Sequence, residues 1–256
     1  IILCEYPFEA SEGSHTDATL TRFETRDEPI MFIGLNTSLY YDQQIFALAH
    51  ELYHFKTKTG KSYTEEENED PLLEKQADRF AAELLLPSGT LHSRVVSEFK
   101  SEMINEALYL RTLRFIARLQ CEWWLPYHAI VNRLYEEKYI NKSFYENLYA
   151  MNDRDDKSVY CRIFKTLDPE KYALLNSRTL RKGVSNAALE TILLNYEDGE
   201  VPDDEFVELL MLFGKSPEDL GYELTVSPDD LDDLNDLFEG GEQDECCLLY
   251  TSDAAD

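Results

Sequence analysis

The sequence has few basic residues and no long apolar run. Lys and Arg make up only 24 of the 256 residues, against 51 Asp and Glu, and the formal net charge is −27. A nucleic-acid surface needs clustered cations to neutralise phosphates, so the acidic part of the chain is a poor candidate for one. Apolar stretches all fall short of the ~18–20 residues that span a bilayer, and no signal-type apolar region opens the sequence.

Cysteines are also scarce. There are 5, an odd number, and none forms a C-x-x-C pair. This pattern does not favour a disulfide framework and is typical of a reducing compartment. The adjacent thiols of Cys246 and Cys247 lack the further ligands that a metal site needs. We therefore expect a cytoplasmic protein with no membrane partner. Because the chain begins with Ile1 and not with Met, the question of an upstream domain stays open.

The negative charge is concentrated toward the C-terminal end. Between Glu197 and Glu245 there are 19 acidic residues and a single cation, Lys215. Residues 227–256 are interpreted as an acidic, disordered tail, although leucines at helical spacing in its first half also fit a short amphipathic interaction helix. Residues 246–256 match neither the charge nor the pattern before them, resemble translated adapter sequence and are treated as non-native.

Periodicity predicts a small sheet followed by helices, an α+β fold. Period-two alternation and short apolar runs favour strands, and apolar residues at three- and four-residue steps favour helices. The expected strands are 1–4, 19–25 and 30–35. The expected helices are 42–58, 72–86 between Pro71 and Pro87, 93–121, 126–138, 184–195 and 203–213, with Gly60 as the stop of the first helix and a loop over 59–70.

These elements predict a small mixed sheet, two helices directly after it, and further helical regions. The expected divisions are a core over 1–95, a helical extension over 96–150 and a C-terminal helical region over 151–226. We also expect an exposed sheet edge. The strand Ile30–Asn36 or its neighbour is a candidate for binding a substrate backbone by strand addition.

The strongest chemical signal is the H-E-x-x-H sequence on the first helix. His50 and His54 are four residues apart, so they project from one helix face and can bind one Zn²⁺ together. Glu51 lies about 100° around the helix from His50. It can therefore act as general base toward a water at the metal without being a ligand itself. The spacing predicts two ligands and one catalytic base.

A second pair of residues supplies what the first motif lacks. A catalytic zinc usually has three protein ligands and one open position. Glu74 would provide the third ligand, and Asp78, one turn later on the same face, would orient a ligand histidine through its free ring nitrogen. Taken alone, Glu74 and Asp78 would be a solvated helix face. With the upstream H-E-x-x-H, we interpret 42–58 as the active-site helix, 72–86 as the second ligand helix and 1–95 as a zinc metallopeptidase core.

The two motifs together resemble the ImmA/IrrE metallopeptidases. The first is Phe46–Phe55, FALAHELYHF, and the second is Glu74–Pro87, EKQADRFAAELLLP. The second motif is the more distinctive of the two. The preceding strand Ile30–Asn36 and the segment Tyr127–Ile140 fit the family's layout, so the resemblance covers roughly residues 28–140. One departure is Tyr53, where family members often carry Gly.

The resemblance implies a compact gluzincin-like fold and a regulatory protease. Members of the family cleave helix-turn-helix repressors of the XRE type, and others lie beside such regulators in phage and toxin–antitoxin loci. It therefore implies a protein substrate that is an XRE-type repressor or an antitoxin. Many members carry an XRE domain at their own N-terminus.

Two other classes of function stay open at this stage. One is a non-catalytic, zinc-containing binding module, although such a site has no use for Glu51. The other is a transcriptional regulator with a DNA-binding part in Leu110–Tyr139. That segment contains Arg111, Arg114, Arg118 and Arg133, but its basic footprint is thin, so direct nucleic-acid binding is not expected. The residue that would stabilise an oxyanion is not selected by the sequence.

Overall fold

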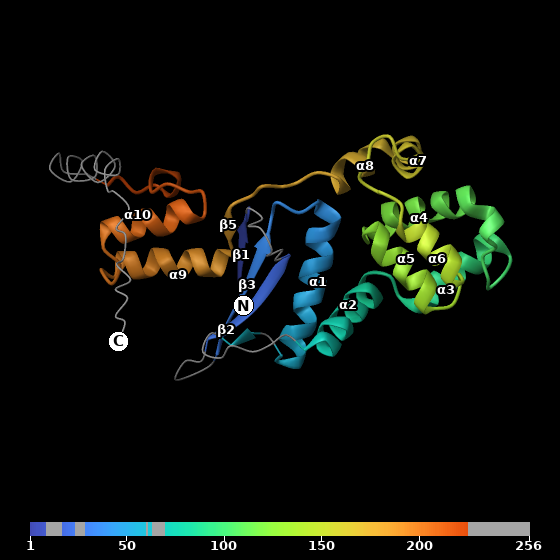
Figure 1. The fold of residues 1–256 in the computed structure, drawn as a ribbon. Helices are drawn as coiled ribbons and strands as arrows, with labels where there is room; N and C mark the ends of the chain where they lie inside the picture. Colours follow the sequence, from blue (N-terminus) through green and yellow to red (C-terminus); the bar gives the residue numbers. More distant parts are fainter. Residues whose placement is uncertain (9–16, 24–28, 60, 63–69, 225–256) are drawn as a thin grey trace, which may run out of the picture.

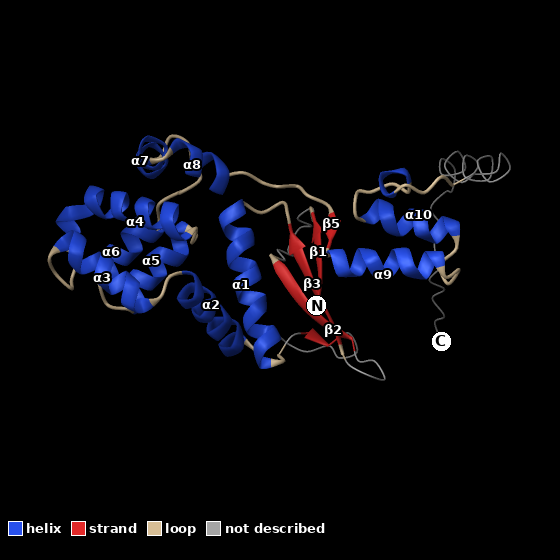
Figure 2. Ribbon diagram, turned by 180° about the vertical axis from the view of Figure 1, so that it is seen from behind, coloured by secondary structure: helices blue, strands red, loops and turns tan. Residues whose placement is uncertain are grey.

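The computed structural model has a small sheet at its centre, with helices on both sides. It describes residues 1–8, 17–23, 29–59, 61–62 and 70–224. The predicted acidic tail and Gly60 lie outside the described residues. As Figures 1 and 2 show, the sheet and helix α1 lie between a group of helices, α3 to α8, and the pair α9 and α10. The α+β fold predicted from the sequence is confirmed.

The elements of the described residues follow in chain order. The strands are β1 (Ile2–Tyr6), β2 (Ala18–Phe23), β3 (Ile30–Asn36), β4 (Lys61–Ser62) and β5 (Gly183–Val184). The helices are α1 (Tyr41–Thr57), α2 (Pro71–Leu85), α3 (Ser88–Phe99), α4 (Tyr109–Trp123), α5 (Tyr127–Glu136), α6 (Lys142–Tyr149), α7 (Val159–Leu167), α8 (Pro169–Leu175), α9 (Asn186–Glu197) and α10 (Asp203–Leu212), with short 3₁₀ turns at Glu106–Leu108 and Glu218–Leu220.

The sheet is mixed, with strand order β4-β2-β3-β1-β5. Strand β3 pairs in parallel with β1 and antiparallel with β2, so both of its edges are occupied. Strand addition at Ile30–Asn36 itself is therefore ruled out, because an added strand needs unpaired backbone groups. In the described part of the chain, the neighbouring β2 pairs with β4 only at Thr21 and Arg22, and strand addition along the rest of that edge stays a prediction. One face of the sheet buries Leu20, Met31 and Ile33 against Leu48 and Phe55 of α1.

Two helices with clear end signals carry the candidate site. Helix α2 begins at Pro71, and the Asp70 side chain caps it by accepting a hydrogen bond from the Leu72 N–H at 2.9 Å. Proline fits the first turn because that turn needs no donor from it. Helix α1 ends at Thr57, and Lys58 takes the left-handed conformation with φ of 60°. The stop predicted at Gly60 thus falls two residues earlier, at a lysine.

The prediction of one helix over 93–121 is wrong. Helix α3 ends at Phe99, where Lys100 is left-handed with φ of 56°, and α4 begins only at Tyr109. Between them, the Asn105 side chain accepts a hydrogen bond from the Ala107 N–H at 2.9 Å. Such local side-chain bonds compete with helical hydrogen bonds and favour a turn. The helical region predicted over 151–226 includes α7 and α8, but the sequence pattern does not place either helix individually.

A single cluster of buried apolar side chains joins α3 to α8. It includes Leu91, Ile116, Tyr127 and Phe164, all at most 1% exposed, and extends from Leu86 to Leu175 along the chain. These residues come from both sides of position 150. The predicted division into domains stays a prediction. In the described residues, no helix is long and apolar enough to cross a membrane.

A buried ion pair ties the start of α1 to this group of helices. The carboxylate of Asp42 has no exposed surface, and the Arg154 guanidinium donates to both of its oxygens at 2.7 Å. Gln120 of α4 donates a third hydrogen bond at 2.7 Å. Burial raises the pKa of Asp42, and Arg154 and Gln120 oppose that rise. These bonds therefore hold the helix that carries His50 to α4 and to the segment between α6 and α7.

Replacing Arg154 with Met is expected to destabilise the fold by about 3–5 kcal/mol at neutral pH, because a buried carboxylate would lose its partner. The pKa of Asp42 would rise further in this variant. The folded state would then bind a proton that the unfolded state does not, so stability should increase as the pH falls toward the ordinary range of Asp. Urea denaturation at neutral and at mildly acidic pH measures both effects. The double variant Asp42→Asn/Arg154→Met should lose less stability than the single one; an equal loss would contradict this account.

Candidate metal centre

Three side chains from two helices converge on one point. His50 and His54 come from α1 and Glu74 comes from α2, and one ligand atom of each lies within 4.8 Å of the others. The Nε2 atoms of the two histidines are 3.1 Å apart. Glu74 places Oε2 at 3.0 Å from Nε2 of His50 and Oε1 at 3.5 Å from Nε2 of His54. The four-residue spacing in α1 brings the two rings to the same side, as predicted.

These distances fit one metal ion. Ligand atoms about 2.0–2.1 Å from a common tetrahedral centre are separated by roughly 3.3–3.4 Å. The observed separations of 3.0 to 3.5 Å surround that value. Two imidazole nitrogens and one carboxylate also form the donor set of catalytic zinc sites that keep one position open. The described residues therefore contain a group that can hold a metal.

The other ring nitrogen of each histidine also has a partner. Nδ1 of His50 donates to Oδ1 of Asp78 at 2.9 Å, the contact that the role predicted for Asp78 requires. Nδ1 of His54 lies 3.1 Å from Oγ1 of Thr59, which the sequence analysis did not single out. A donor bond at Nδ1 leaves Nε2 free as an acceptor for a metal and fixes the orientation of the ring.

The electrostatic surroundings of the two histidines differ. Burial alone would lower the pKa of His50, but the hydrogen bond and charge of Asp78, with Glu51 and Glu74, raise it above the ordinary value. The pKa of His54 is lowered, chiefly by burial and also by His50, against the opposing charge of Glu74. His54 is thus suited to be a neutral ligand at neutral pH, and a metal that bound there would compete with the protonation of His50.

Glu51 lies next to the cluster without belonging to it. Glu51 is only 6% exposed. It is not a member of the group formed by His50, His54 and Glu74. Its charge is one of the causes that raise the pKa of His50, so the carboxylate is near enough to act on that ring. This position is compatible with a group that works beside the metal and not on it.

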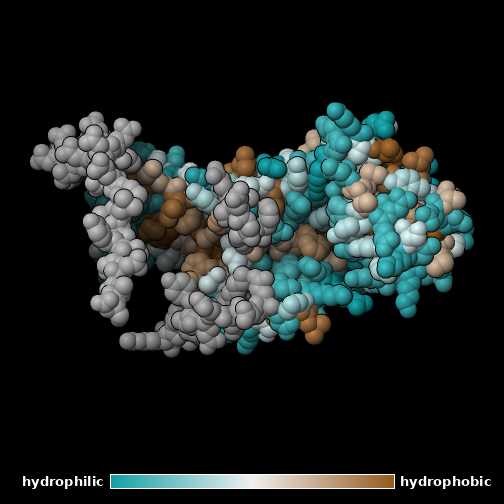
Figure 3. All heavy atoms as spheres, viewed as in Figure 1, coloured by the Kyte–Doolittle hydropathy of each residue, from teal (hydrophilic) through white to brown (hydrophobic). Residues whose placement is uncertain are grey.

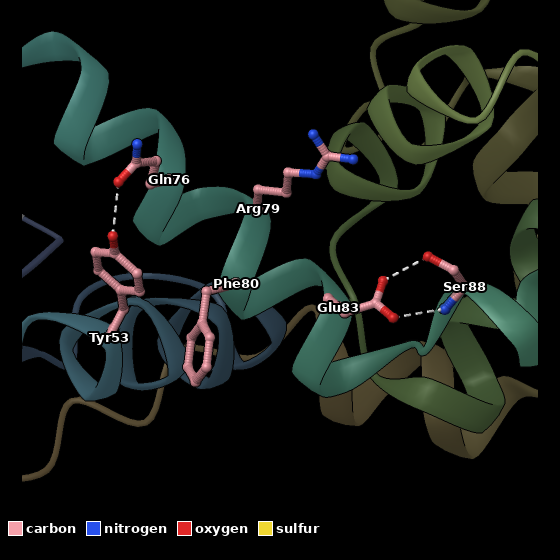
Figure 4. A pocket seen from close by; sticks show the side chains of 6 residues that line it. All are labelled: Tyr53, Gln76, Arg79, Phe80, Glu83 and Ser88. Atoms are coloured by element: carbon pink, nitrogen blue, oxygen red, sulfur yellow. Dashed lines mark hydrogen bonds between the residues drawn. The ribbon is translucent and has the colours of Figure 1, made fainter. Parts of the chain in front are cut away.

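Tyr53 occupies the motif position where family members often carry Gly. Its ring packs against Phe80, with centroids 5.6 Å apart, and its hydroxyl donates to Oε1 of Gln76 at 2.7 Å. These contacts join α1 to α2. The same three residues line an open pocket of about 450 Å³ (Figure 4), together with Arg79, Glu83 and Ser88. Gln76 lies about 200° around α2 from Glu74, so this pocket is on the other side of the helix from the metal ligands.

The arginines considered for DNA binding are largely engaged within the fold. Arg111 and Arg118 each pair with Glu98, at 2.9 and 2.7 Å. Arg133 is 1% exposed and donates to Glu83 at 2.6 Å and to the Leu86 carbonyl oxygen at 3.2 Å. Its charge holds the turn between α2 and α3. Arg133 is thus unavailable to phosphates, and Glu98 offsets part of the charge of Arg111 and Arg118, which weakens the transcriptional-regulator alternative.

The fold and the cluster together define a class. A helix with H-E-x-x-H, a second helix with Glu74 and a small mixed sheet make the arrangement of a metallopeptidase. The sequence model of a family described as Peptidase_M78, the IrrE N-terminal-like domain, matches residues 3–135, and the chain belongs to this metallopeptidase family. The resemblance stated from the two motifs is confirmed. Comparison with curated proteins and with solved structures found no significant match.

Removing either orienting partner should weaken metal binding without abolishing it. We expect Asp78→Ala and Thr59→Val each to lower the affinity for zinc by about 10–100-fold, as is usual for groups that orient metal-ligating histidines. Competition with a fluorescent zinc chelator measures the affinity. The matched control is Gln76→Ala, which removes a hydrogen bond between the same two helices but does not touch a ligand. Equal losses in all three variants would mean that helix packing, and not ring orientation, is responsible.

Proposed function

We propose that this chain is a zinc metalloendopeptidase that makes a site-specific cut in a helix-turn-helix regulator of the XRE type or in an antitoxin partner. The observation that carries the proposal is the convergence of His50, His54 and Glu74 within 4.8 Å, on the helices that bear the family's two motifs. Membership of a peptidase family implies a protein substrate. The regulator as substrate follows from the resemblance to ImmA/IrrE proteins.

The residues divide the chemistry among themselves. His50, His54 and Glu74 would hold Zn²⁺, which when bound supplies a Lewis acid that polarises the scissile carbonyl and lowers the pKa of water to near 7. Glu51 accepts the proton of the attacking water and passes it to the leaving amine. Asp78 and Thr59 keep the two rings oriented through their Nδ1 atoms. We place this activity in the cytoplasm.

The proposal is tested with the purified chain and the XRE-type regulator encoded nearest to its gene. Incubation should give two discrete fragments, whose ends are identified by mass spectrometry. Removal of metal with a chelator should stop cleavage, and added Zn²⁺ should restore it. Cleavage that continues at the same rate in the metal-free chain would refute the zinc-dependent mechanism. Intact regulator in every condition, with tight binding instead, would favour the binding-module alternative.

A further inference from the structure

Helices α9 and α10 form a small hairpin held together by its own aromatic contacts. The rings of Tyr196 and Phe206 are stacked, with centroids 3.8 Å apart and planes 6° from parallel, and Tyr222 packs edge-on against both. Phe206 and Leu210 are fully buried. Gly199 makes the turn between the helices with φ of 75°, a conformation that suits glycine. The apolar side chains between the two helices are thus buried by contacts with each other and with Tyr222.

The side of α10 that points away from α9 carries two large apolar side chains that are exposed. Met211 is 64% exposed and Leu212 is 54% exposed. Met211 and Leu212 lie about 100° and 200° around α10 from the buried Leu210, so they point away from the inner contact. Figure 3 shows hydrophobic surface over this part of the molecule. Exposed apolar residues that gather on one element mark interaction sites.

Carboxylates surround these apolar side chains. Residues 186–224 contain 11 acidic residues and one cation, Lys215. Glu208 lies three residues before Met211 and four before Leu212, Asp204 lies four residues before Glu208, and Glu205 lies seven before Leu212. These spacings place the three exposed carboxylates on the same side of α10 as the two apolar side chains. Among the described residues, none of the acidic groups of 186–224 forms an ion pair. The face is therefore apolar in its middle and strongly negative around it.

We propose that the outer face of α10 docks a cationic amphipathic helix of a protein partner. Met211 and Leu212 would contact the apolar side of that helix, as apolar side chains do in other complexes of amphipathic helices. The carboxylates would pair with the flanking lysines and arginines and steer the partner toward the face. Nucleic acid and anionic lipid do not fit, because both are negative. DNA-binding proteins present basic helices, so the hairpin fits the substrate class proposed above; only this last link rests on the proposed function.

The docking is measured as binding and not as cleavage. The probe is a fluorescein-labelled helix of leucine and lysine, about 18 residues and thus about five turns long. Fluorescence anisotropy with the full chain should show binding that weakens as salt is added. Two matched peptides separate the contributions: one has serine in place of leucine, and the other has glutamate in place of lysine. Both should bind at least about tenfold more weakly.

Two variants locate the face. Met211→Ser/Leu212→Ser should weaken binding of the leucine–lysine helix by at least about tenfold, because two exposed apolar side chains lose their contacts. Asp204→Asn/Glu205→Gln/Glu208→Gln should weaken it by about tenfold at low salt. The charge-matched control is Glu102→Gln/Glu136→Gln/Glu146→Gln, three exposed carboxylates elsewhere, which should change the affinity by less than about twofold. All the substituted side chains are exposed, and circular dichroism checks that the fold is retained.

Several results would overturn the proposal. Equal binding of the serine–lysine peptide would reduce the effect to general charge attraction. Equal losses in the hairpin variants and in the control would place the binding elsewhere. Binding that appears only after removal of residues 225–256 would assign the face to this chain's own C-terminal segment. Because zinc and cleavage play no part in the measurement, failure of the peptidase mechanism would leave the result interpretable.

Discussion

Glu51→Gln is expected to lower the rate of substrate cleavage by about 10²–10⁴-fold while about one zinc per chain is retained. That range is the usual contribution of a positioned general base, and the amide of glutamine cannot accept the proton of the attacking water. The substitution keeps the size and shape of a side chain that is only 6% exposed, so little destabilisation is expected. Glu51 is not one of the three ligand residues, and its loss should not empty the site.

The measurement combines metal content with single-turnover cleavage of the regulator. The matched comparison is Asp78→Ala, in which the orienting bond to His50 is lost. Excess zinc should restore most of the cleavage rate of Asp78→Ala, because that variant has a binding defect. The same zinc should not rescue Glu51→Gln, whose defect lies in proton transfer. Full cleavage activity in Glu51→Gln would refute the role of general base.

The candidate site is predictable from the sequence because its parts are local. A helix fixes the relation between residues four apart, so His50 and His54 must share a face wherever the helix lies. Glu74 and Asp78 repeat that relation on the second helix, whose start at Pro71 is also signalled locally. Only the approach of the two helices is non-local. The four-residue spacing in each helix lets that approach be inferred, and the structure brings the side chains together.

What the sequence did not reveal depends on contacts between distant residues or on irregular backbone. Thr59 lies beyond the end of α1 and reaches His54 through the left-handed turn at Lys58, which has no glycine signal. Asp42 and Arg154 are separated by 112 positions, and no local pattern pairs them. The internal place of β3 likewise depends on pairing with β1 and β2. Each of these features is decided by tertiary contacts.

Loss of Glu74, the expected third ligand, is predicted to give the other large effect. Glu74→Ala should reduce zinc affinity by more than about 100-fold, beyond the range for groups that only orient a ligand, because two imidazoles alone cannot complete the site. Cleavage should fall to background at ordinary zinc concentrations. Glu74 is 36% exposed at its side chain, and its removal creates no buried cavity. The fold should therefore survive, and the loss can be attributed to the metal.

Plasma mass spectrometry of the purified chains tests this expectation directly. The wild-type chain should carry about one zinc, as a single site of three protein ligands requires, and Glu74→Ala should carry almost none after dialysis. The matched control is Lys75→Ala, an exposed neighbour on the same helix turn, which should keep its zinc. Full zinc content in Glu74→Ala would move the third ligand to another carboxylate. No zinc in the wild-type chain, even after incubation with the metal, would leave H-E-x-x-H without its catalytic use and favour a binding module, because every role given to Glu51 depends on a metal held by His50 and His54.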